Sequence, residues 1–182
     1  MRNFSSAMLL LLPLLLALAP GDLAPSFKAK NQDGKVIKLA DFKNKFVLLY
    51  FYPMDNTPGC TTEAKNFGTE YAKIKEMNAE VFGVSRQGEK SHKKFKSKYN
   101  LPFDLLVDAD GSLAKQFGVG IVPVVGFTSR QSILIGPDGK VIRFYDDVDP
   151  STHAQVVLED IRKASGKAKP KKPISTLSHG TT

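Results

Sequence analysis

The sequence predicts an α/β fold in which strands alternate with helices. Short runs rich in β-branched and aromatic residues are separated by longer segments whose apolar residues recur every three or four positions. The last two of these runs flank a Pro-Asp-Gly turn at residues 137–139 and are therefore expected to form a hairpin. An alternation of this kind is typical of a sheet covered by helices.

The first half of the chain provides two strands and a long helix. Residues 36–39 follow an Asp-Gly turn and predict a short strand. Residues 46–52 are continuously apolar, which predicts a strand buried on both faces. A helix is expected from Cys60 to Met77, with one face packed inward. The apolar positions of that face are Ala64, Phe67, Tyr71 and Ile74.

The second half continues the alternation. The expected elements are a strand at 80–85, a lysine-rich exposed helix at 91–99, a strand at 105–107, a short helix at 112–117, and strands at 132–135 and 141–145. A last helix is expected to begin at Asp149-Pro150, because proline suits the first helical turn. Its core-facing residues are Ala154, Val157, Leu158 and Ile161.

The N-terminus has the pattern of a secretory signal peptide. A single positive charge at Arg2 precedes an apolar run from Ala7 to Ala19, which is shorter than the about 20 residues that span a bilayer. We expect residues 1–20 to be a cleaved signal, with an uncleaved membrane anchor as the alternative, and cleavage after Ala19 or after Gly21 fits the pattern. Such a signal predicts the secretory pathway or secretion, or an organelle such as a plastid, without stable membrane insertion after cleavage.

The formal net charge of +8 is concentrated near the C-terminus. Six basic and no acidic residues lie from Arg162 onward, which leaves 20 basic against 18 acidic residues in the rest of the chain. We therefore expect one nearly balanced domain at residues 21–163, no nucleic-acid partner, and a disordered basic tail at 164–182. A solubilising role for the tail and weak attachment to an anionic surface both remain open.

Cys60 is the only cysteine of the chain. It follows the apolar strand of residues 46–52 and a Thr-Pro-Gly turn, which places the thiol at the N-terminus of the next helix. The unpaired amides and the helix dipole favour a thiolate at that position. A buried cysteine that packs as a small hydrophobe is the competing interpretation, but a packing cysteine would more often lie inside a periodic apolar pattern than directly after a Thr-Pro-Gly turn. We therefore expect a reactive thiol.

The sequence around Cys60 resembles a known family. Residues 50–64, Tyr-Phe-Tyr-Pro-Met-Asp-Asn-Thr-Pro-Gly-Cys-Thr-Thr-Glu-Ala, are similar to the active-site signature of peroxiredoxins, specifically the bacterioferritin-comigratory-protein or Q-type branch. The resemblance extends over residues 21–163. It implies a thioredoxin-like fold, with a central mixed β-sheet flanked by helices, and a thiol-dependent peroxidase without a cofactor. The segments that carry it beyond the signature are 21–27, 33–35, 91–95, 101–103 and 134–140.

The resemblance assigns catalytic roles to four residues. Cys60 attacks the peroxide O–O bond as a thiolate and becomes a sulfenic acid. Thr57 forms a hydrogen bond between the thiolate and the substrate, and Pro53 shields the site. Arg130, which matches the family's distant arginine, stabilises the thiolate and the departing oxygen. Hydrogen peroxide and organic hydroperoxides are the expected substrates.

Two further residues are expected at the substrate. Gly59 contributes the backbone beside Cys60, and Glu63 resembles a glutamate of the family. A glutamate in the first helical turn is also a routine partner of the helix dipole, so both interpretations of Glu63 remain open. His92 and His153 lack the spacing and the partners of metal ligands. We expect them at exposed helix positions and predict no metal site.

The main departure from the family pattern is Lys65. Many Q-type members carry a resolving cysteine at this position, five residues after the peroxidatic one, so the chain resembles a one-cysteine variant. An external thiol, such as thioredoxin, glutaredoxin or glutathione, is the expected reductant, and a monomer or weak dimer is the expected assembly. Arg86 and Gln87 also depart from the pattern, at an expected surface turn, and residues 119–127 lack the usual tyrosine and glycine content.

A single cysteine on this fold is compatible with other functions. A general thiol–disulfide oxidoreductase requires Cys-x-x-Cys, which the chain lacks. A non-enzymatic binding or chaperone-like protein remains an alternative, because fold alone does not determine function. A redox sensor, or an intermolecular disulfide in an oxidising compartment, is a further alternative.

Overall fold

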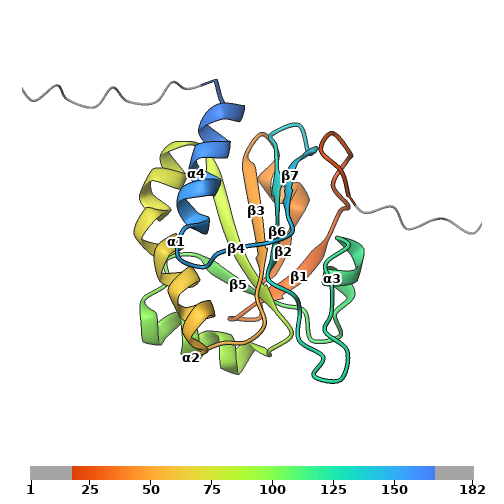
Figure 1. The fold of residues 1–182 in the computed structure, drawn as a ribbon, viewed down its shortest axis with the longest axis vertical. Coiled ribbons are helices and arrows are strands. Elements are labelled where there is room, and N and C mark those ends of the chain that lie inside the picture. The colour runs from red at the N-terminus through yellow and green to blue at the C-terminus, as the bar shows by residue number, and fades with distance from the viewer. Residues whose placement is uncertain (1–17, 167–182) are drawn as a thin grey trace, which may run out of the picture.

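The structure is a computed structural model that describes residues 18–166. A seven-stranded mixed sheet, in the order β2-β1-β5-β4-β3-β6-β7, forms its centre (Figure 1). The strands are β1 (Lys28–Asn31), β2 (Val36–Lys38), β3 (Phe46–Phe51), β4 (Ala79–Ser85), β5 (Asp104–Val107), β6 (Gln131–Ile135) and β7 (Val141–Tyr145).

Parallel and antiparallel pairs occupy different parts of this sheet. β3, β4 and β5 are parallel to one another, whereas β6 and β1 pair antiparallel with the outer strands of that group. β6 and β7 form the expected hairpin around residues 136–140. Because β6 runs against β3, the start of β6 lies beside the end of β3, with Phe51 opposite Gln131. This register determines which residues meet at the functional site.

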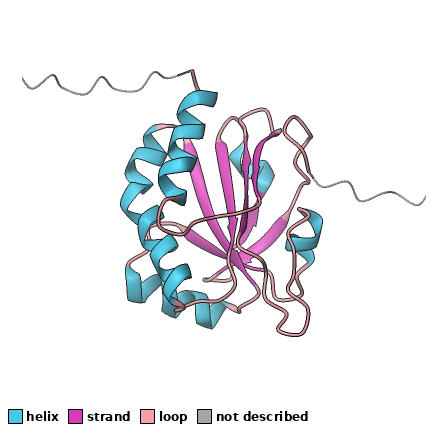
Figure 2. Cartoon of the chain, viewed as in Figure 1, coloured by secondary structure: helices cyan, strands magenta, loops and turns pink. Residues whose placement is uncertain are grey.

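Helices cover both faces of the sheet (Figure 2). The long helix α1 (Pro58–Glu76), together with α2 (Glu89–Tyr99) and α4 (His153–Ala164), packs on one face. The 3-10 helix η1 (Leu39–Phe42) and the short α3 (Ser112–Gln116) lie on the other. β3 is fully buried for this reason. Its side chains alternate between the two cores, with Leu48 and Tyr50 in one and Val47, Leu49 and Phe51 in the other.

The expected elements are present with shifted ends, and one further strand is present that the sequence did not predict. β1 has the sequence Lys-Ala-Lys-Asn, which lacks the β-branched and aromatic residues that mark a strand, and it forms only through pairing with β2 and β5. The last helix begins at His153 instead of Asp149-Pro150. Residues 149–152 form a turn in which the Asp149 carboxylate accepts a hydrogen bond from the Ser151 amide at 2.8 Å.

The expectations for the two chain ends concern residues largely outside the described range. The signal peptide expected at 1–20 overlaps the described residues only from 18 onward, and the tail expected at 164–182 only up to 166. Both stay predictions. Within residues 18–166, no helix is both long enough and apolar enough to cross a membrane.

Candidate active site

The segment between β3 and α1 places Cys60 beyond the carboxyl end of β3, in the first turn of α1. Pro58 occupies the first turn of α1, and Thr57 precedes it in an extended conformation. The hydroxyl of Thr57 donates to the Met54 carbonyl at 3.0 Å, and the Thr57 side chain does not cap the helix. The first-turn amides around Cys60 therefore keep their polarity for the thiol or for a ligand.

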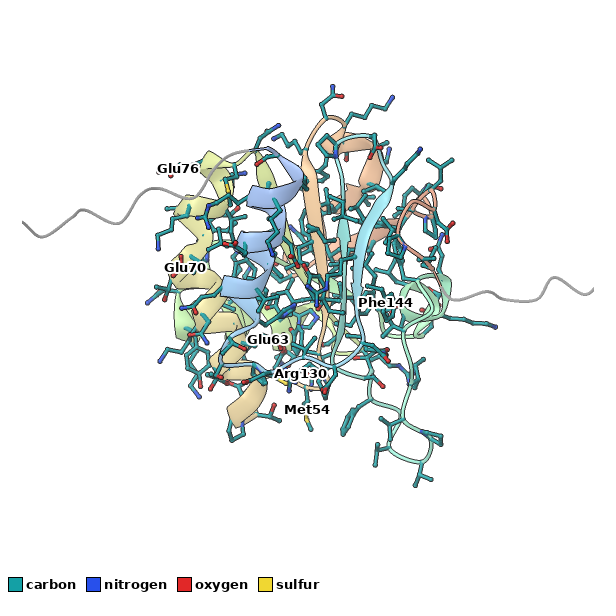
Figure 3. All side chains as sticks on the ribbon, turned by 45° about the horizontal axis from the view of Figure 1, so that its top comes forward. Met54, Glu63, Glu70, Glu76, Arg130 and Phe144 are labelled. Carbon is teal, nitrogen blue, oxygen red and sulfur yellow. The ribbon has the colours of Figure 1, made fainter. Side chains whose placement is uncertain are left out.

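Arg130 reaches Cys60 from the start of β6. It directly precedes Gln131, whose pairing with Phe51 places Arg130 beside the end of β3. Its Nη2 donates to Cys60 Sγ at 3.3 Å, and its Nη1 donates to Glu63 Oε2. Figure 3 shows the Glu63 and Arg130 side chains close together at this end of the molecule, with Met54 nearby. The structure thus unites two residues that lie 70 positions apart in the sequence.

Glu63 is fully buried and forms two polar contacts. One carboxylate oxygen pairs with Arg130, and the other lies 2.8 Å from His153 Nδ1. Burial alone would lower the pKa of Arg130, but the negative charges of Glu63 and Cys60 outweigh it and raise that pKa. The guanidinium therefore stays charged beside the sulfur. The interpretation of Glu63 as a routine dipole partner is wrong, because its carboxylate is engaged inside the fold; its role in binding substrate stays a prediction.

Gly59 and Pro53 complete the immediate surroundings of the thiol. A Cβ atom at Gly59 would lie 3.2 Å from Arg130 Nη2 and 3.6 Å from Pro150 Cγ. A side chain here would require the guanidinium to shift by a few tenths of an ångström, so the glycine leaves room for the close approach of Arg130. Pro53 is half-buried in the loop before α1, where it can shield the site. Its role and those of Thr57 and Gly59 stay predictions.

The expectation of exposed histidines is wrong for both residues. His92 is 0% exposed and His153 is 3% exposed. His92 lies three residues before buried Phe95, and His153 lies four residues before buried Val157. Each histidine therefore continues the inward face of its helix. Helical spacing alone contained this signal, whereas the expectation of exposure rested on metal-ligand spacing.

His92 belongs to a buried network that holds the loop before α1. The Asp55 carboxylate accepts hydrogen bonds from Tyr52 Oη and Ser91 Oγ, each at 2.7 Å, and lies 3.0 Å from His92 Nδ1. His92 Nε2 is 3.2 Å from the Leu106 carbonyl. Burial alone would raise the pKa of Asp55, but the hydrogen bond and charge of His92, with the hydroxyl donors, lower it. The carboxylate is therefore held ionised.

Arg86 and Gln87 do more than form a surface turn. Gln87 Oε1 accepts a hydrogen bond from the Asp55 amide at 2.5 Å. Arg86 donates to the Gly126 carbonyl at 2.6 Å, and so braces the loop that leads to Arg130. The tip of that loop exposes Val122, Val124 and Val125. Both loops that carry site residues are thus tied to the end of β4.

A separate surface cavity of about 480 Å³ lies away from Cys60. It is lined mainly by apolar and backbone groups from residues 23–26, 39–47 and 135–139. None of the site residues lines this cavity. Cys60 itself is only 1% exposed and belongs to the apolar core on the α1 face of the sheet, with Arg130 donating to its sulfur.

Comparison with known proteins identifies the family. Residues 20–144 match the model of the AhpC/TSA family. The chain belongs to this family. It is 38% identical to the peroxiredoxin Bcp of Bacillus subtilis, over 81% of this chain and 97% of that protein. It is 40% identical to the chloroplastic peroxiredoxin Q of Suaeda salsa, over 76% of this chain and 65% of that protein.

Solved structures of family members have the same fold. Peroxidoxin BcpB from Mycobacterium tuberculosis superposes with a TM-score of 0.74 at 30% identity, covering 80% of this chain and 97% of the other. A cysteine-to-serine mutant of PrxQ from Xylella fastidiosa gives 0.74 at 30% identity, covering 81% and 98%. The expected thioredoxin-like fold, the Bcp/Q-type resemblance and the enzyme class, a thiol-dependent peroxidase, are thereby confirmed. Among its relatives the chain is a variant with one cysteine.

Proposed function

We propose that the chain reduces hydrogen peroxide and organic hydroperoxides through a sulfenic acid on Cys60. The contact of Arg130 Nη2 with Cys60 Sγ at 3.3 Å, at the N-terminus of α1, carries the proposal. It places a permanent positive charge beside the sulfur and leaves the guanidinium next to the oxygen that sulfur attacks. The bacterioferritin comigratory protein of Xanthomonas campestris, whose structure superposes with a TM-score of 0.70 at 28% identity, has alkyl peroxide reduction activity, which supports the inclusion of organic hydroperoxides.

The proposed first step is a displacement at oxygen. The Cys60 thiolate forms a bond to the terminal peroxide oxygen, and the O–O bond breaks. Its electron pair remains on the other oxygen, which takes a proton and leaves as water or an alcohol. Sulfur is oxidised to the sulfenic acid. Arg130 stabilises the charge on the departing oxygen, and Thr57, whose hydroxyl keeps free lone pairs, accepts a hydrogen bond from the attacked peroxide oxygen.

Orientation contributes more to the rate than ionisation does. Shifting a thiol from mostly protonated to mostly ionised near neutral pH gains about tenfold, or about 1.4 kcal/mol. Enzymes commonly accelerate reactions by more than about a million-fold. The larger share must come from positioning the peroxide and from stabilising charge as the O–O bond breaks. The first-turn amides near Gly59, Thr57 and Arg130 are the groups placed to do so.

The second step requires an external thiol. The sequence holds no second cysteine, so an intramolecular disulfide is excluded. A first external thiol displaces the sulfenic hydroxyl as water and forms a mixed disulfide, and a second thiol releases reduced Cys60. Cys60 is 1% exposed, so this reductant gains access only when the first turn of α1 opens. Thioredoxin, glutaredoxin and glutathione are the proposed reductants.

The proposal extends to assembly and compartment. A monomer or weak dimer is proposed, since the site is completed by residues of a single chain. Entry into the secretory pathway, or into an organelle such as a plastid, rests on the predicted signal at residues 1–20. Chloroplastic relatives such as the Suaeda salsa protein support the plastid alternative.

A peroxide-consumption assay tests the proposal. Hydrogen peroxide and cumene hydroperoxide are supplied separately, each with thioredoxin, glutaredoxin or glutathione and its recycling system. The matched control is Cys60→Ser, which removes the nucleophile with minimal change in volume. Turnover with at least one reductant, absent in Cys60→Ser, supports the proposal. Equal consumption by both proteins, or none by either, would favour the binding or chaperone-like alternative.

A further inference from the structure

A chain of four side chains leads from the thiol to α4. Arg130 Nη2 donates a hydrogen bond to Cys60 Sγ, and Arg130 Nη1 donates one to Glu63 Oε2. The other carboxylate oxygen, Glu63 Oε1, lies 2.8 Å from His153 Nδ1. Within residues 18–166, no hydrogen bond joins His153 directly to Cys60. His153 nevertheless completes the set of contacts that determines how Arg130 meets the sulfur.

The surroundings of His153 determine which proton it carries. A carboxylate only accepts hydrogen bonds, so the Nδ1–H group donates a hydrogen bond to Glu63 Oε1. Nε2 is buried and has no hydrogen-bond partner within the described part of the chain. The ring packs edge-on against Phe67 and Tyr145, with centroids 5.1 and 5.2 Å away. An N–H at Nε2 would be a buried donor without an acceptor, which places the hydrogen of the ring on Nδ1, facing Glu63.

The Arg130–Glu63 pair has an unusual geometry that His153 explains. Arginine and carboxylate groups commonly pair through two parallel hydrogen bonds. Here Glu63 accepts from one guanidinium nitrogen, because its second oxygen faces His153. The other nitrogen, Nη2, is thereby left to donate to Cys60. Without the donor at His153, Glu63 Oε1 would be buried without a partner and would attract Nη2 away from the sulfur.

We propose that His153 is a positioning residue: by occupying Glu63 Oε1 it limits Arg130 to a single hydrogen bond with Glu63, and so directs Arg130 Nη2 onto Cys60. The inference rests on the proposed function, in which Arg130 stabilises the departing oxygen. Its effect falls on peroxide reduction, which needs the aligned guanidinium. Alkylation of Cys60 by iodoacetamide needs only the thiolate and depends less on this alignment.

Two substitutions of similar polarity separate positioning from a structural role. In His153→Asn the amide nitrogen replaces Nδ1 and can still donate to Glu63. In His153→Gln the longer side chain places its amide near the former Nε2, away from Glu63. Misplacement of a catalytic group by about 1 Å can cost about 100-fold, so peroxide oxidation of Cys60 should slow by about that factor in His153→Gln. It should stay within about threefold of wild type in His153→Asn, and alkylation should change little in either variant.

Two controls test the route through Arg130. Tyr145→Phe removes a hydroxyl that bonds to Asp160 at 2.9 Å and leaves the ring against His153, so it reports general destabilisation and should not alter the peroxide rate. In an Arg130→Met background, His153→Gln should cause no further loss of peroxide rate. An equal loss in both backgrounds, or an equal loss in the Asn and Gln variants, overturns the proposal.

A structural readout keeps the inference independent of the activity. A crystal structure of His153→Gln should show both Arg130 nitrogens on Glu63 and a lengthened Nη2–Sγ distance, whereas His153→Asn should retain the wild-type contacts. An unchanged Arg130 in His153→Gln overturns the proposal even if the enzyme slows. If wild-type protein shows no peroxidase activity but Arg130 turns as described, the proposed function fails and the positioning role of His153 stands.

Discussion

Two buried histidine–carboxylate pairs flank the segment that carries Cys60, and they differ in how completely they are satisfied. In the pair Asp55–His92, both ring nitrogens have partners: Nδ1 faces the Asp55 carboxylate, and Nε2 lies near the Leu106 carbonyl and Ser85 Oγ. In the pair Glu63–His153, only Nδ1 has a partner in the described structure, and the buried Nε2 has none. The first pair belongs to a network whose other members are structural groups, Tyr52, Ser91 and the Leu106 carbonyl. The second ends on Arg130, which contacts the reacting sulfur.

This difference indicates that the Asp55–His92 pair stabilises the loop before α1, whereas the Glu63–His153 pair orients Arg130. A saturated buried network rigidifies the backbone around it, and Asp55 holds the loop before α1 to Tyr52, to α2 and to Gln87. The Glu63–His153 pair holds the Arg130 side chain instead of a loop, and the orientation of Arg130 matters only in the reaction. We therefore expect changes at Asp55 to lower stability first, and changes at Glu63 or His153 to lower peroxide reactivity first.

The largest effect is expected for Asp55→Ala. It leaves the buried His92 Nδ1 and two hydroxyl donors without their acceptor, and breaking a buried pair on one side costs about 3–5 kcal/mol of unfolding free energy. Glu70→Ala is the matched control, because Glu70 on α1 (Figure 3) is partly exposed and its partner Lys73 is 62% exposed, so the pair is worth about 0–1 kcal/mol. Urea denaturation measures both. A loss at Asp55 no larger than at Glu70 would remove the anchoring role.

The second effect concerns activity and is expected for Arg130→Met. Loss of the donor to the reacting oxygens should slow peroxide oxidation of Cys60 by about 100-fold or more, a cost of about 2.7 kcal/mol. Stability should change far less than in Asp55→Ala. Stopped-flow oxidation and iodoacetamide alkylation are compared on the same protein. If the two rates fall by the same factor, Arg130 acts only on the thiolate and the transition-state role is refuted.

A smaller effect is expected in the pH dependence of stability. The folded-state pKa of Asp55 lies below its ordinary value, so the unfolded chain binds the proton more readily. The resulting stabilisation is fully present above the unfolded value of about 3.9 and is lost as the pH falls through the folded pKa. The free energy of unfolding, measured by urea denaturation at a series of pH values from 6 downward, should therefore fall more steeply with decreasing pH in wild type than in Asp55→Asn. Parallel curves would show that Asp55 is not the group that titrates.

The sequence predicted most of the sheet and the central site residues, for physical reasons that differ by element. β3 was predictable because a strand buried on both faces is continuously apolar, and Cys60 because a turn and a helical pattern meet there. Arg130 was placed only through the family resemblance. Its contact with Cys60 depends on the β3–β6 register, which local pattern does not determine.

The histidines and β1 show what local pattern misses. β1 has little strand propensity and is formed by its neighbours. His92 and His153 are polar residues on inward helix faces, and the expectation of exposure followed from their lack of metal-ligand spacing instead of from their helical spacing. Their carboxylate partners lie 37 and 90 positions away. A buried polar residue is tolerable only with such a partner, and the partner is visible only in the folded chain.

The smallest effect on the folded state is expected for Lys65→Cys, and it tests whether the two histidine pairs open separately. Lys65 is exposed on α1, whereas Cys60 faces the core. In an intact helix, residues five apart rise about 7.5 Å and their Cα atoms are more than about 8 Å apart. A disulfide requires less than about 7 Å. A bond between the two positions therefore forms only if the first turns of α1 unwind.

Unwinding between positions 60 and 65 displaces Glu63 and so breaks its contacts with Arg130 and His153, whereas the Asp55–His92 pair precedes the helix and can stay closed. After one equivalent of peroxide, intact mass of the Lys65→Cys variant under non-reducing conditions should show the loss of two hydrogens and no free thiol. Hydrogen exchange in that state should accelerate at the amides of residues 60–65 and stay slow at residues 52–55. Sulfinic acid at Cys60 beside a free introduced thiol would show that the first turns do not open. Faster exchange in both segments would show instead that the loop and the helix open as one unit. The Asp55–His92 pair would then not anchor the loop independently of the Glu63–His153 pair.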